Sequence, residues 1–250
     1  MIIVIRQIGN EMYACPDRES AVLTRDMQFT PSTHRYACMT WRMHHGRGER
    51  AYWIGKRFFD LAFSLTMLIV LSPLLLLLAL LVVLTSRGPA IYRHRRLGKN
   101  GRIIQVLKFR TMVDHADQHL DSLTARQRRE FSERFKLEND PRVTAFGRFL
   151  RRTSLDELPQ LVNIVLGEMS LVGPRPVVAE EAAKYGADRE RFLSVTPGLT
   201  GYWQAYARSS CDYEQRMRME LEYVGHANAL WDLQILLATC RTVLLGKGAE

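Results

Sequence analysis

Two adjacent carboxylates, Asp156 and Glu157, follow an arginine-rich stretch in the sequence FGRFLRRTSLDELPQLVN. An ionised carboxylate can attack phosphorus to give an acyl phosphate, and nearby arginines keep it ionised and contact phosphate oxygens. A second carboxylate can bind Mg²⁺, which screens phosphate charge. A structural interpretation competes with this one, because Ser154 and Glu157 have the spacing of a capping box at a helix start. Spacing alone favours the structural interpretation.

Three further basic residues are candidates for binding phosphate. The segment GPRP, residues 173–176, holds Arg175 between Pro174 and Pro176. Proline restricts the backbone on both sides, so the guanidinium is presented with little flexibility and can hold a diphosphate. A purely structural turn is the alternative. Lys108 and Arg110 in LKFRTM are either phosphate ligands or ordinary surface charge.

Other patterns are weak or missing. His115 and His119 are four residues apart and could bind metal, but they fall in a charged segment that is typical of a solvated helix. The sequence contains no GxxxxGK[ST], GxGxxG or GxSxG pattern, so the P-loop, dinucleotide and hydrolase fingerprints are excluded. The four cysteines are scattered without CxxC spacing and fit a reducing compartment.

The elements that must position the carboxylates begin with an uncharged run from Leu61 to Leu84. As a helix at about 1.5 Å per residue it extends about 36 Å, enough to cross a hydrocarbon core of about 30 Å. Ser72-Pro73 divides the run, and proline bends a helix. The hydroxyl of Ser72 can satisfy a carbonyl that the bend frees. We therefore expect a chain associated with a membrane.

The charges beside this run bear on its topology. Positive charge marks cytoplasmic flanks, and a simple crossing shows an asymmetry between its two ends. Here both flanks are basic, which favours a re-entrant helix that turns at Ser72-Pro73 and leaves on the side where it entered. A kinked helix that spans the bilayer is the alternative. The flanking residues are Lys56 and Arg57 before the run, then Arg87, Arg93, Arg95, Arg96 and Lys99 after it.

The overall charge limits the partners. The chain has 250 residues, a net charge of +9 and a pI of about 9.6. A basic chain can bind nucleic acid, anionic lipid or a phosphorylated substrate, and the apolar run favours the last two. Basic and acidic residues alternate and form no aromatic-lined stripe, so nucleic acid is not an expected partner.

Local patterns predict the remaining elements of an α+β, helix-rich fold with one Ser-Pro kinked re-entrant membrane helix and a small hairpin. Residues 1–50 are polar and poorly periodic, which predicts a mobile extension. The sequence leaves open whether translation starts at Met1 or at a later methionine. Asn100-Gly101 between two apolar runs predicts the hairpin. We expect helices over 114–136, 154–166, 177–185, the segment CDYEQRMRMELEYVG and the apolar tail. The tail packs as core or lies at the membrane interface. The segments GEMSLVGPRP and TPGLTGYWQAYARSS are predicted to be loops.

Together these residues resemble the bacterial sugar transferase family, the monotopic polyprenyl-phosphate sugar-1-phosphate transferases of the type that initiates exopolysaccharide assembly. The resemblance covers about Lys56 to Ala249. The blocks that carry it are KRFFDL with Ser72-Pro73, RRLGKNG, KFRTM, DPRVTAFGRFLRRTSLDELPQLVNI, GEMSLVGPRP, TPGLTGYWQ and WDLQILLAT. Their order predicts three parts: a mobile extension over 1–50, the re-entrant helix over 56–86 and a cytoplasmic catalytic domain over 87–250.

The resemblance implies a reaction and a set of residues. Family members move a sugar-1-phosphate from a UDP-sugar to polyprenyl phosphate, release UMP and require Mg²⁺. Asp156 matches the nucleophile and Glu157 its partner, and both would hold the metal. Arg151 matches a position linked to the polyprenyl phosphate, and Pro174, Arg175 and Pro176 match a loop near the nucleotide. The implied location is the cytoplasmic face of a bacterial inner membrane, in contact with lipid.

Departures and rival functions remain. His94 stands where many members have glutamine, Glu220 where aspartate is frequent, and Gly225 to Asn228 replace a more usual turn. One rival is a membrane-anchored glycosyltransferase, which would release UDP instead of UMP. The other is a non-enzymatic scaffold for polysaccharide assembly, which would not need Asp156.

Overall fold

The computed structural model describes residues 4–8, 11–15, 21–23, 47–113, 137, 140–207 and 211–244. The chain divides into two compact units, Met1–Gly46 and Arg47–Glu250. In the first unit, β1 (Val4–Ile8), β2 (Glu11–Cys15) and β3 (Ala21–Leu23) form an antiparallel sheet in that order. The sequence patterns did not predict these strands. The mobility expected of residues 1–50 stays a prediction, as do the three predicted domain boundaries.

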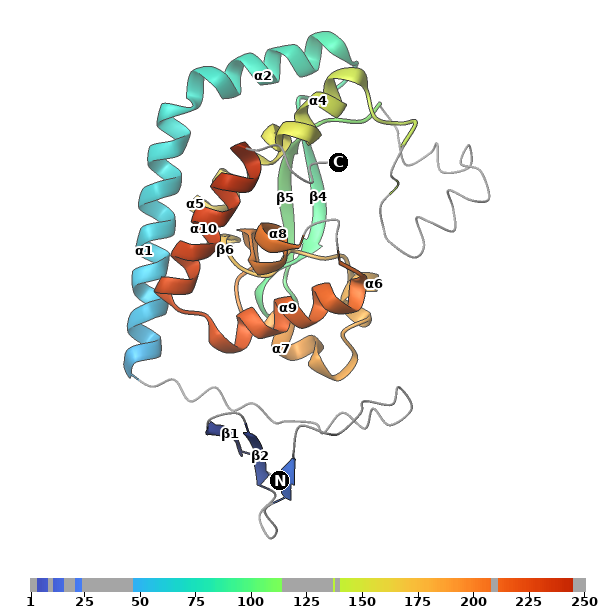
Figure 1. Ribbon diagram of the computed structural model, residues 1–250. Coiled ribbons are helices and arrows are strands. Elements are labelled where there is room, and N and C mark those ends of the chain that lie inside the picture. The colour runs from blue at the N-terminus through green and yellow to red at the C-terminus, as the bar shows by residue number, and fades with distance from the viewer. Residues whose placement is uncertain are drawn as a thin grey trace. The chain divides into compact units, whose positions relative to one another are not determined.

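Two helices form a bent arm in the second unit (Figure 1). α1 (Arg47–Val70) and α2 (Ser72–Thr85) meet at an angle of 65°. The hydroxyl of Ser72 donates to the carbonyl of Ile69 at 2.8 Å, as the sequence predicted. Among the described helices, no single one is long and apolar enough to cross a membrane, whereas this bent pair together meets that test. The re-entrant topology stays a prediction, and α1 begins well before the predicted residue 56.

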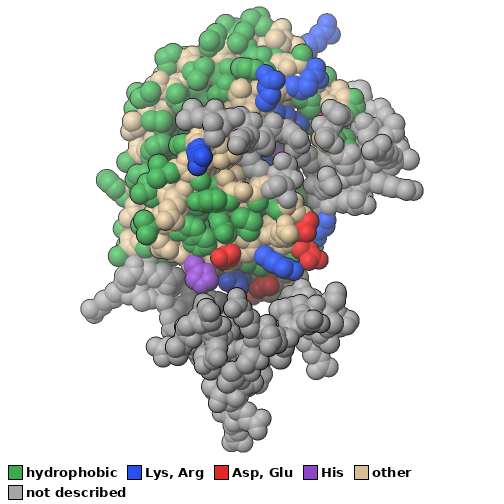
Figure 2. Space-filling model, in the orientation of Figure 1, with side chains coloured by type: hydrophobic (Ala, Val, Ile, Leu, Met, Phe, Trp, Pro, Cys, Tyr) green, Lys and Arg blue, Asp and Glu red, His purple; other side chains and the backbone are tan. Residues whose placement is uncertain are grey.

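The arm exposes much apolar surface. Figure 2 shows hydrophobic side chains along the edge formed by α1 and α2. The most exposed among them are Phe58 at 74%, Ile69 at 73%, and Ile54 and Leu76 at 72% each. In contrast, Leu78 and Val82 of α2 are buried against the remainder of the unit. A continuous exposed apolar face of this kind marks an interaction surface, and lipid is the occupant that the sequence predicts.

The predicted hairpin is confirmed. β4 (Ile91–Leu97) pairs antiparallel with β5 (Ile103–Phe109). The turn is the 3₁₀ segment Lys99–Gly101, in which Asn100 has φ 57°, a left-handed conformation that asparagine and glycine tolerate. Because side chains alternate along a strand, His94 and Arg96 share a face with their cross-strand partners and with Lys108.

The rest of the unit is mostly short helices. β6 (Ser170–Val172) and β7 (Gly198–Thr200) pair in parallel, which corrects the loops predicted for GEMSLVGPRP and TPGLTGYWQAYARSS. Gly198 is needed there, because a Cβ on it would lie 2.1 Å from the backbone nitrogen of Gly173. The elements are α4 (Ala145–Thr153), a 3₁₀ turn (Leu155–Glu157), α5 (Gln160–Leu166), β6 (Ser170–Val172), α6 (Ala179–Ala183), α7 (Arg189–Leu193), β7 (Gly198–Thr200), α8 (Tyr202–Tyr206), α9 (Tyr213–His226) and α10 (Ala229–Leu244).

The main core lies between the hairpin, α5, β6 and α10. Its fully buried members include Val106, Ile164 and Ile235. Ile235 shows that α10 packs as core on one side, while Leu230 and Leu237 on its other side are 66% and 62% exposed. The helix-rich architecture with small sheets agrees with the predicted α+β class. The helix predicted over 114–136, with His115 and His119, lies outside the described residues.

Polar contacts fasten α1 to this core. Asp232 of α10 accepts hydrogen bonds from the hydroxyl of Tyr52 at 2.8 Å and from Nζ of Lys56 at 2.7 Å. Arg57 donates to two carbonyls at the end of α5, at 2.6 and 2.9 Å. These contacts fix the arm relative to the helix that follows the two candidate carboxylates.

Candidate active site

The carboxylate pair lies in a 3₁₀ turn between two helices. α4 begins at the N-cap Thr144, whose side chain accepts from the amide of Gly147 at 2.9 Å, and it ends at Ser154. Ser154 has φ 57°, the left-handed conformation of a helix C-cap, so the predicted capping box is wrong. The next helix, α5, begins only at Gln160, after Pro159. Glu157 is therefore available for a contact other than capping.

Glu157 pairs with Lys108 of β5. Nζ of Lys108 lies 2.5 Å from Oε1 of Glu157, and both side chains are partly buried. Burial by itself would raise the pKa of Glu157. The charge of Lys108, followed by that of Arg175, outweighs this effect and lowers the pKa to about 2. Glu157 is accordingly ionised at neutral pH and ties the 3₁₀ turn to the hairpin.

Asp156 is in a different environment from its neighbour. It is 8% exposed, and burial raises its pKa to about 6, supported by the negative charge of Glu157. Lys108 and Arg151 act in the opposite direction. Nε of Arg151 donates to the hydroxyl of Thr111 at 2.9 Å, which orients this arginine. Asp156 is thus a carboxylate with little hydration beside two cations, which suits a nucleophile toward phosphorus.

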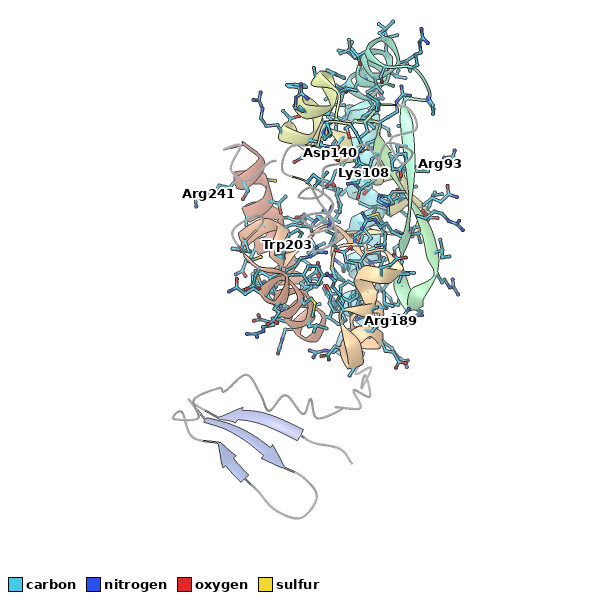
Figure 3. The ribbon with its side chains drawn as sticks, turned by 90° about the vertical axis from the view of Figure 1, so that its right-hand side faces the viewer. Arg93, Lys108, Asp140, Arg189, Trp203 and Arg241 are labelled. Carbon is cyan, nitrogen blue, oxygen red and sulfur yellow. The ribbon has the colours of Figure 1, made fainter. Side chains whose placement is uncertain are left out.

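A pocket lies beside the carboxylate pair, and Glu157 lines it whereas Asp156 does not. The hairpin supplies one wall, with the side chain of Lys108 directed inward and Arg93 directed away on the outer side (Figure 3). The 3₁₀ turn and α5 supply a second wall, and loops around β6 and β7 together with α8 supply the rest. The lining residues are His94, Arg96, Val106, Lys108, Glu157, Gln160, Arg175, Pro176, Gly198, Leu199 and Gln204.

The GPRP loop reaches the pocket through Arg175. The carbonyl of Pro174 accepts from the amide of Gly198 at 2.9 Å, and the carbonyl of Pro176 accepts from Arg96 at 3.3 Å. Pro174 and Pro176 are buried, while Arg175 is partly exposed in the pocket wall. The structure therefore brings Arg175, Lys108 and Glu157 together.

Arg110 is placed differently from the other candidates. Its guanidinium donates to the carbonyls of Ser86 at 2.8 Å, of Gly88 at 3.0 Å and of Arg87. Arg110 is 8% exposed and does not line the pocket. It holds the chain just after α2, and its substrate role stays a prediction without a contact in its favour.

The sequence analysis did not assign a role to several pocket residues. His94 and Arg96 belong to β4, Gln160 begins α5 and Gln204 lies in α8. Strand alternation could have identified the first two, because they share the inner face of the hairpin with Lys108. No local pattern marks the two glutamines.

The carboxylates of Asp156 and Glu157 are the metal ligands that the sequence predicted. In the described part of the chain, no three His, Cys, Asp or Glu side chains lie close enough to form a metal cage. Mg²⁺ commonly takes one or two carboxylates and completes its shell with water and substrate phosphates. Asp156 and Glu157 fit an ion of this kind by donor type and number, because they offer two carboxylates at adjacent positions in one turn.

Comparison with known proteins identifies similar chains. A sequence model described as bacterial sugar transferase matches residues 51–246. The chain is 42% identical over 227 residues to the undecaprenyl-phosphate galactose phosphotransferase of Salmonella typhimurium, covering 90% of this chain and 47% of that protein. It is 44% identical over 199 residues to the exopolysaccharide production protein ExoY of Sinorhizobium fredii, covering 78% and 88%. The chain thus spans about half the length of the Salmonella protein and most of ExoY.

Proposed function

This chain belongs to the bacterial sugar transferase family, and from that membership we propose that it transfers a hexose-1-phosphate from a UDP-sugar to undecaprenyl phosphate and releases UMP. The product would initiate assembly of an exopolysaccharide or a related glycan. The single observation that carries the proposal is the environment of Asp156: a nearly buried carboxylate beside two cations, next to a pocket lined with basic groups.

In the first half-reaction, Asp156 attacks the phosphorus that carries the sugar. A bond forms between a carboxylate oxygen and this phosphorus, and the bond to the bridging oxygen of the diphosphate breaks. UMP departs with that oxygen, leaving the sugar phosphate on Asp156. Burial helps here, because a poorly hydrated carboxylate is a stronger nucleophile than one in water, while Lys108 and Arg151 keep it ionised.

In the second half-reaction, an oxygen of undecaprenyl phosphate attacks the same phosphorus. The bond between phosphorus and Asp156 breaks, and the carboxylate is regenerated. Arg151 is assigned to the lipid phosphate, because it stands beside Asp156 and is oriented by Thr111. Separating the two steps allows a soluble donor and a lipid acceptor to use one carboxylate in turn.

The basic pocket is assigned to the diphosphate of the donor. Lys108 and Arg175 contribute positive charge from the hairpin and from the GPRP loop. Both already act on Glu157, so an incoming diphosphate meets cations that the protein holds in place. Mg²⁺ bound at Asp156 and Glu157 would supply further charge neutralisation to the diphosphate.

We assign the site to the cytoplasmic face of a bacterial inner membrane. The exposed apolar face of α1 and α2 supports this assignment, as does the basic character of the chain. In this arrangement the arm enters one leaflet and holds the pocket at the depth where a lipid phosphate emerges.

The test is a product assay with purified protein, a panel of UDP-sugars, undecaprenyl phosphate and Mg²⁺. We expect UMP to appear with one preferred sugar, and mass spectrometry of acid-quenched protein to locate a sugar phosphate on Asp156. Asp156→Asn should lose the adduct and at least about 10³-fold in turnover.

The rival functions give different results in the same experiment. Release of UDP would support a glycosyltransferase. Polymer production that survives Asp156→Asn in cells but not removal of the apolar arm would support a scaffold. Either outcome contradicts the covalent phosphoryl transfer.

A further inference from the structure

Arg175 is held through its backbone by a residue from a distant helix. Pro174 and Pro176 have no amide hydrogen, so Arg175 carries the only backbone donor of this tripeptide. That amide donates to Oε1 of Glu220 in α9 at 3.1 Å. Because a partly buried amide needs an acceptor, the carboxylate of Glu220 fixes the backbone at residue 175 itself, between prolines whose carbonyls other residues hold.

Glu220 is itself fixed from two other sides. It is 3% exposed, and its second oxygen accepts from the hydroxyl of Tyr185. Nε of Arg216, one turn earlier in α9, lies 3.6 Å from Oε1. Burial raises the pKa of Glu220, whereas Arg216 opposes the shift most strongly. A carboxylate buried at such a cost in hydration is a poor choice for stability alone.

The same carboxylate belongs to a charged cluster behind the pocket. Arg216 also pairs with Glu181 at 2.9 Å, and Arg96 reaches Glu181 at 3.3 Å. Arg175 and Arg216 both lie against the ring of Trp203, at 5.9 and 4.5 Å from its centroid. Two carboxylates thus hold three arginines near one another, and two of these arginines face the pocket.

We propose that Glu220 is a positioning residue that holds Arg175 toward the diphosphate of the UDP-sugar. Its carboxylate does not line the pocket and acts only through the amide of residue 175. This inference rests on the proposed function, because that function assigns Arg175 to the diphosphate.

The test is a double-mutant cycle read out as binding of UDP to the purified full chain. Glu220→Ala should weaken UDP binding about 10-fold, the order expected for one lost hydrogen bond to a charged group. Arg175→Ala should weaken it at least as much, and the double variant should match Arg175→Ala alone. If the two losses multiply instead, Glu220 does not act through Arg175 and the inference fails.

Further readouts separate positioning from general destabilisation. The KM for undecaprenyl phosphate should stay unchanged in Glu220→Ala, while the KM for the UDP-sugar rises. Glu220→Gln, which retains an oxygen for the amide of Arg175, should bind UDP within about 3-fold of the wild type. If Glu220→Ala does not fold, Glu220→Leu replaces it, because leucine fills a similar volume and offers the amide of Arg175 no acceptor.

A matched control lies on the same helix. Glu214 of α9 forms an exposed pair with Arg218 at 3.4 Å, and Glu214→Gln should leave UDP binding unchanged. Wild-type affinity in Glu220→Ala would overturn the inference. The proposed function fails separately, by release of UDP in place of UMP, and UDP binding in the cycle does not depend on which product is released.

Discussion

At the scale of single residues, neighbouring carboxylates acquire different properties from their partners. Glu157 has direct contact with Lys108, and its pKa falls to about 2. Asp156 is more deeply buried, and its pKa rises to about 6. Both are ionised at neutral pH, and burial opposes the ionisation of both; the direct contact with Lys108 overcomes this effect in Glu157, whereas in Asp156 the effect of burial prevails. This division suits Glu157 to a fixed electrostatic role and Asp156 to attack.

Replacing Lys108 should therefore damage the site without removing a carboxylate. In Lys108→Met, Glu157 loses its direct partner and the pocket loses a cation. We expect kcat/KM for the UDP-sugar to fall about 10²-fold, the scale of a lost charge-assisted contact. Lys99→Met, at an exposed position in the hairpin turn, is the control and should match the wild type. A loss below about 3-fold in Lys108→Met would show that this cation is dispensable.

The acid sensitivity of the fold should depend on His94. Burial first, then the charges of Arg96, Lys108 and Arg175, lower the pKa of His94 from 6.5 to about 4. His94 therefore takes up a proton near pH 6.5 in the unfolded chain, but only near pH 4 in the folded chain. Stability should fall as pH drops through this window, by about 1–2 kcal/mol at pH 5.

The measurement is thermal unfolding of detergent-solubilised protein at pH 7.5 and pH 5. His94→Gln should reduce the difference between the two midpoints, because the variant has no group to protonate in this window. His226→Gln, at an exposed residue of α9, is the comparison and should keep the wild-type difference. Equal pH dependence in His94→Gln and the wild type would refute the assignment.

Sequence reasoning at this scale named candidate residues but could not give their contacts. The pair Asp156 and Glu157 could be identified because its arginines are close in sequence. The capping box failed because Ser154 takes a left-handed conformation at the end of α4, which spacing does not reveal. Arg110 and Arg175 were both named as phosphate-binding candidates, and only tertiary contacts separate the first from the pocket.

At the scale of elements, α4 is placed by a backbone contact that leaves no room for a side chain. A Cβ on Gly147 would lie 2.0 Å from the carbonyl oxygen of Thr111. The same threonine receives a hydrogen bond from Arg151, one helical turn further along. The close approach therefore sets the position of Arg151, and through the end of α4 it also sets the turn that carries Asp156.

Gly147→Ala should push α4 away from Thr111. Overpacking against backbone typically costs about 1–3 kcal/mol, and we expect the upper end because the carbonyl has little freedom to move. Activity should fall as well, since Arg151 moves with the helix. Gly55→Ala is the matched control: a Cβ there meets nothing within 4 Å in α1, so it should be neutral or stabilise by about 0.5–1 kcal/mol. Thermal unfolding and UMP release measure both effects.

Which elements could be predicted depended on how local their signals are. The hairpin was evident from Asn100-Gly101, because the turn chemistry lies within the sequence of the hairpin itself. β6 and β7 were missed because each has three residues and their parallel pairing joins distant segments. α10 was ambiguous for a different reason: it has a buried side, where the predicted core packing is confirmed, and an exposed apolar side, for which contact with the membrane interface stays a prediction.

At the scale of the whole molecule, the second unit combines the bent arm with the pocket. Asp60 of α1 accepts from the hydroxyl of Ser170 at 2.6 Å and from the amide of Leu171 at 3.2 Å, so α1 contacts β6 directly. These contacts join residues more than a hundred positions apart, and no local pattern could have predicted them. They make α1 both part of the unit that holds the pocket and part of the apolar arm.

The Lys56–Asp232 pair should couple the arm to the rest of the unit. Both side chains are nearly buried, so removing one partner leaves an unpaired charge, at a cost of about 3–5 kcal/mol. Lys56→Met and Asp232→Asn should each lower the thermal midpoint strongly. The double variant should be less destabilised than the sum of the two, and an additive result would mean that the pair does not interact.

The last prediction concerns the topology of the arm. A re-entrant pair leaves the start of α1 and the hairpin on one side of the membrane, whereas a spanning pair separates them. In a variant without the four native cysteines, Arg50→Cys and Lys99→Cys place single thiols at these two exposed points. With a reagent that cannot cross the inner membrane, we expect neither thiol to be labelled in intact cells and both to be labelled after permeabilisation.

A thiol at Ser72→Cys, beside the bend, should resist the same reagent when it is applied from the far side of the membrane. Labelling of one end alone in intact cells, or full labelling at Ser72→Cys from that side, would favour a spanning helix and move one end of the arm away from the pocket.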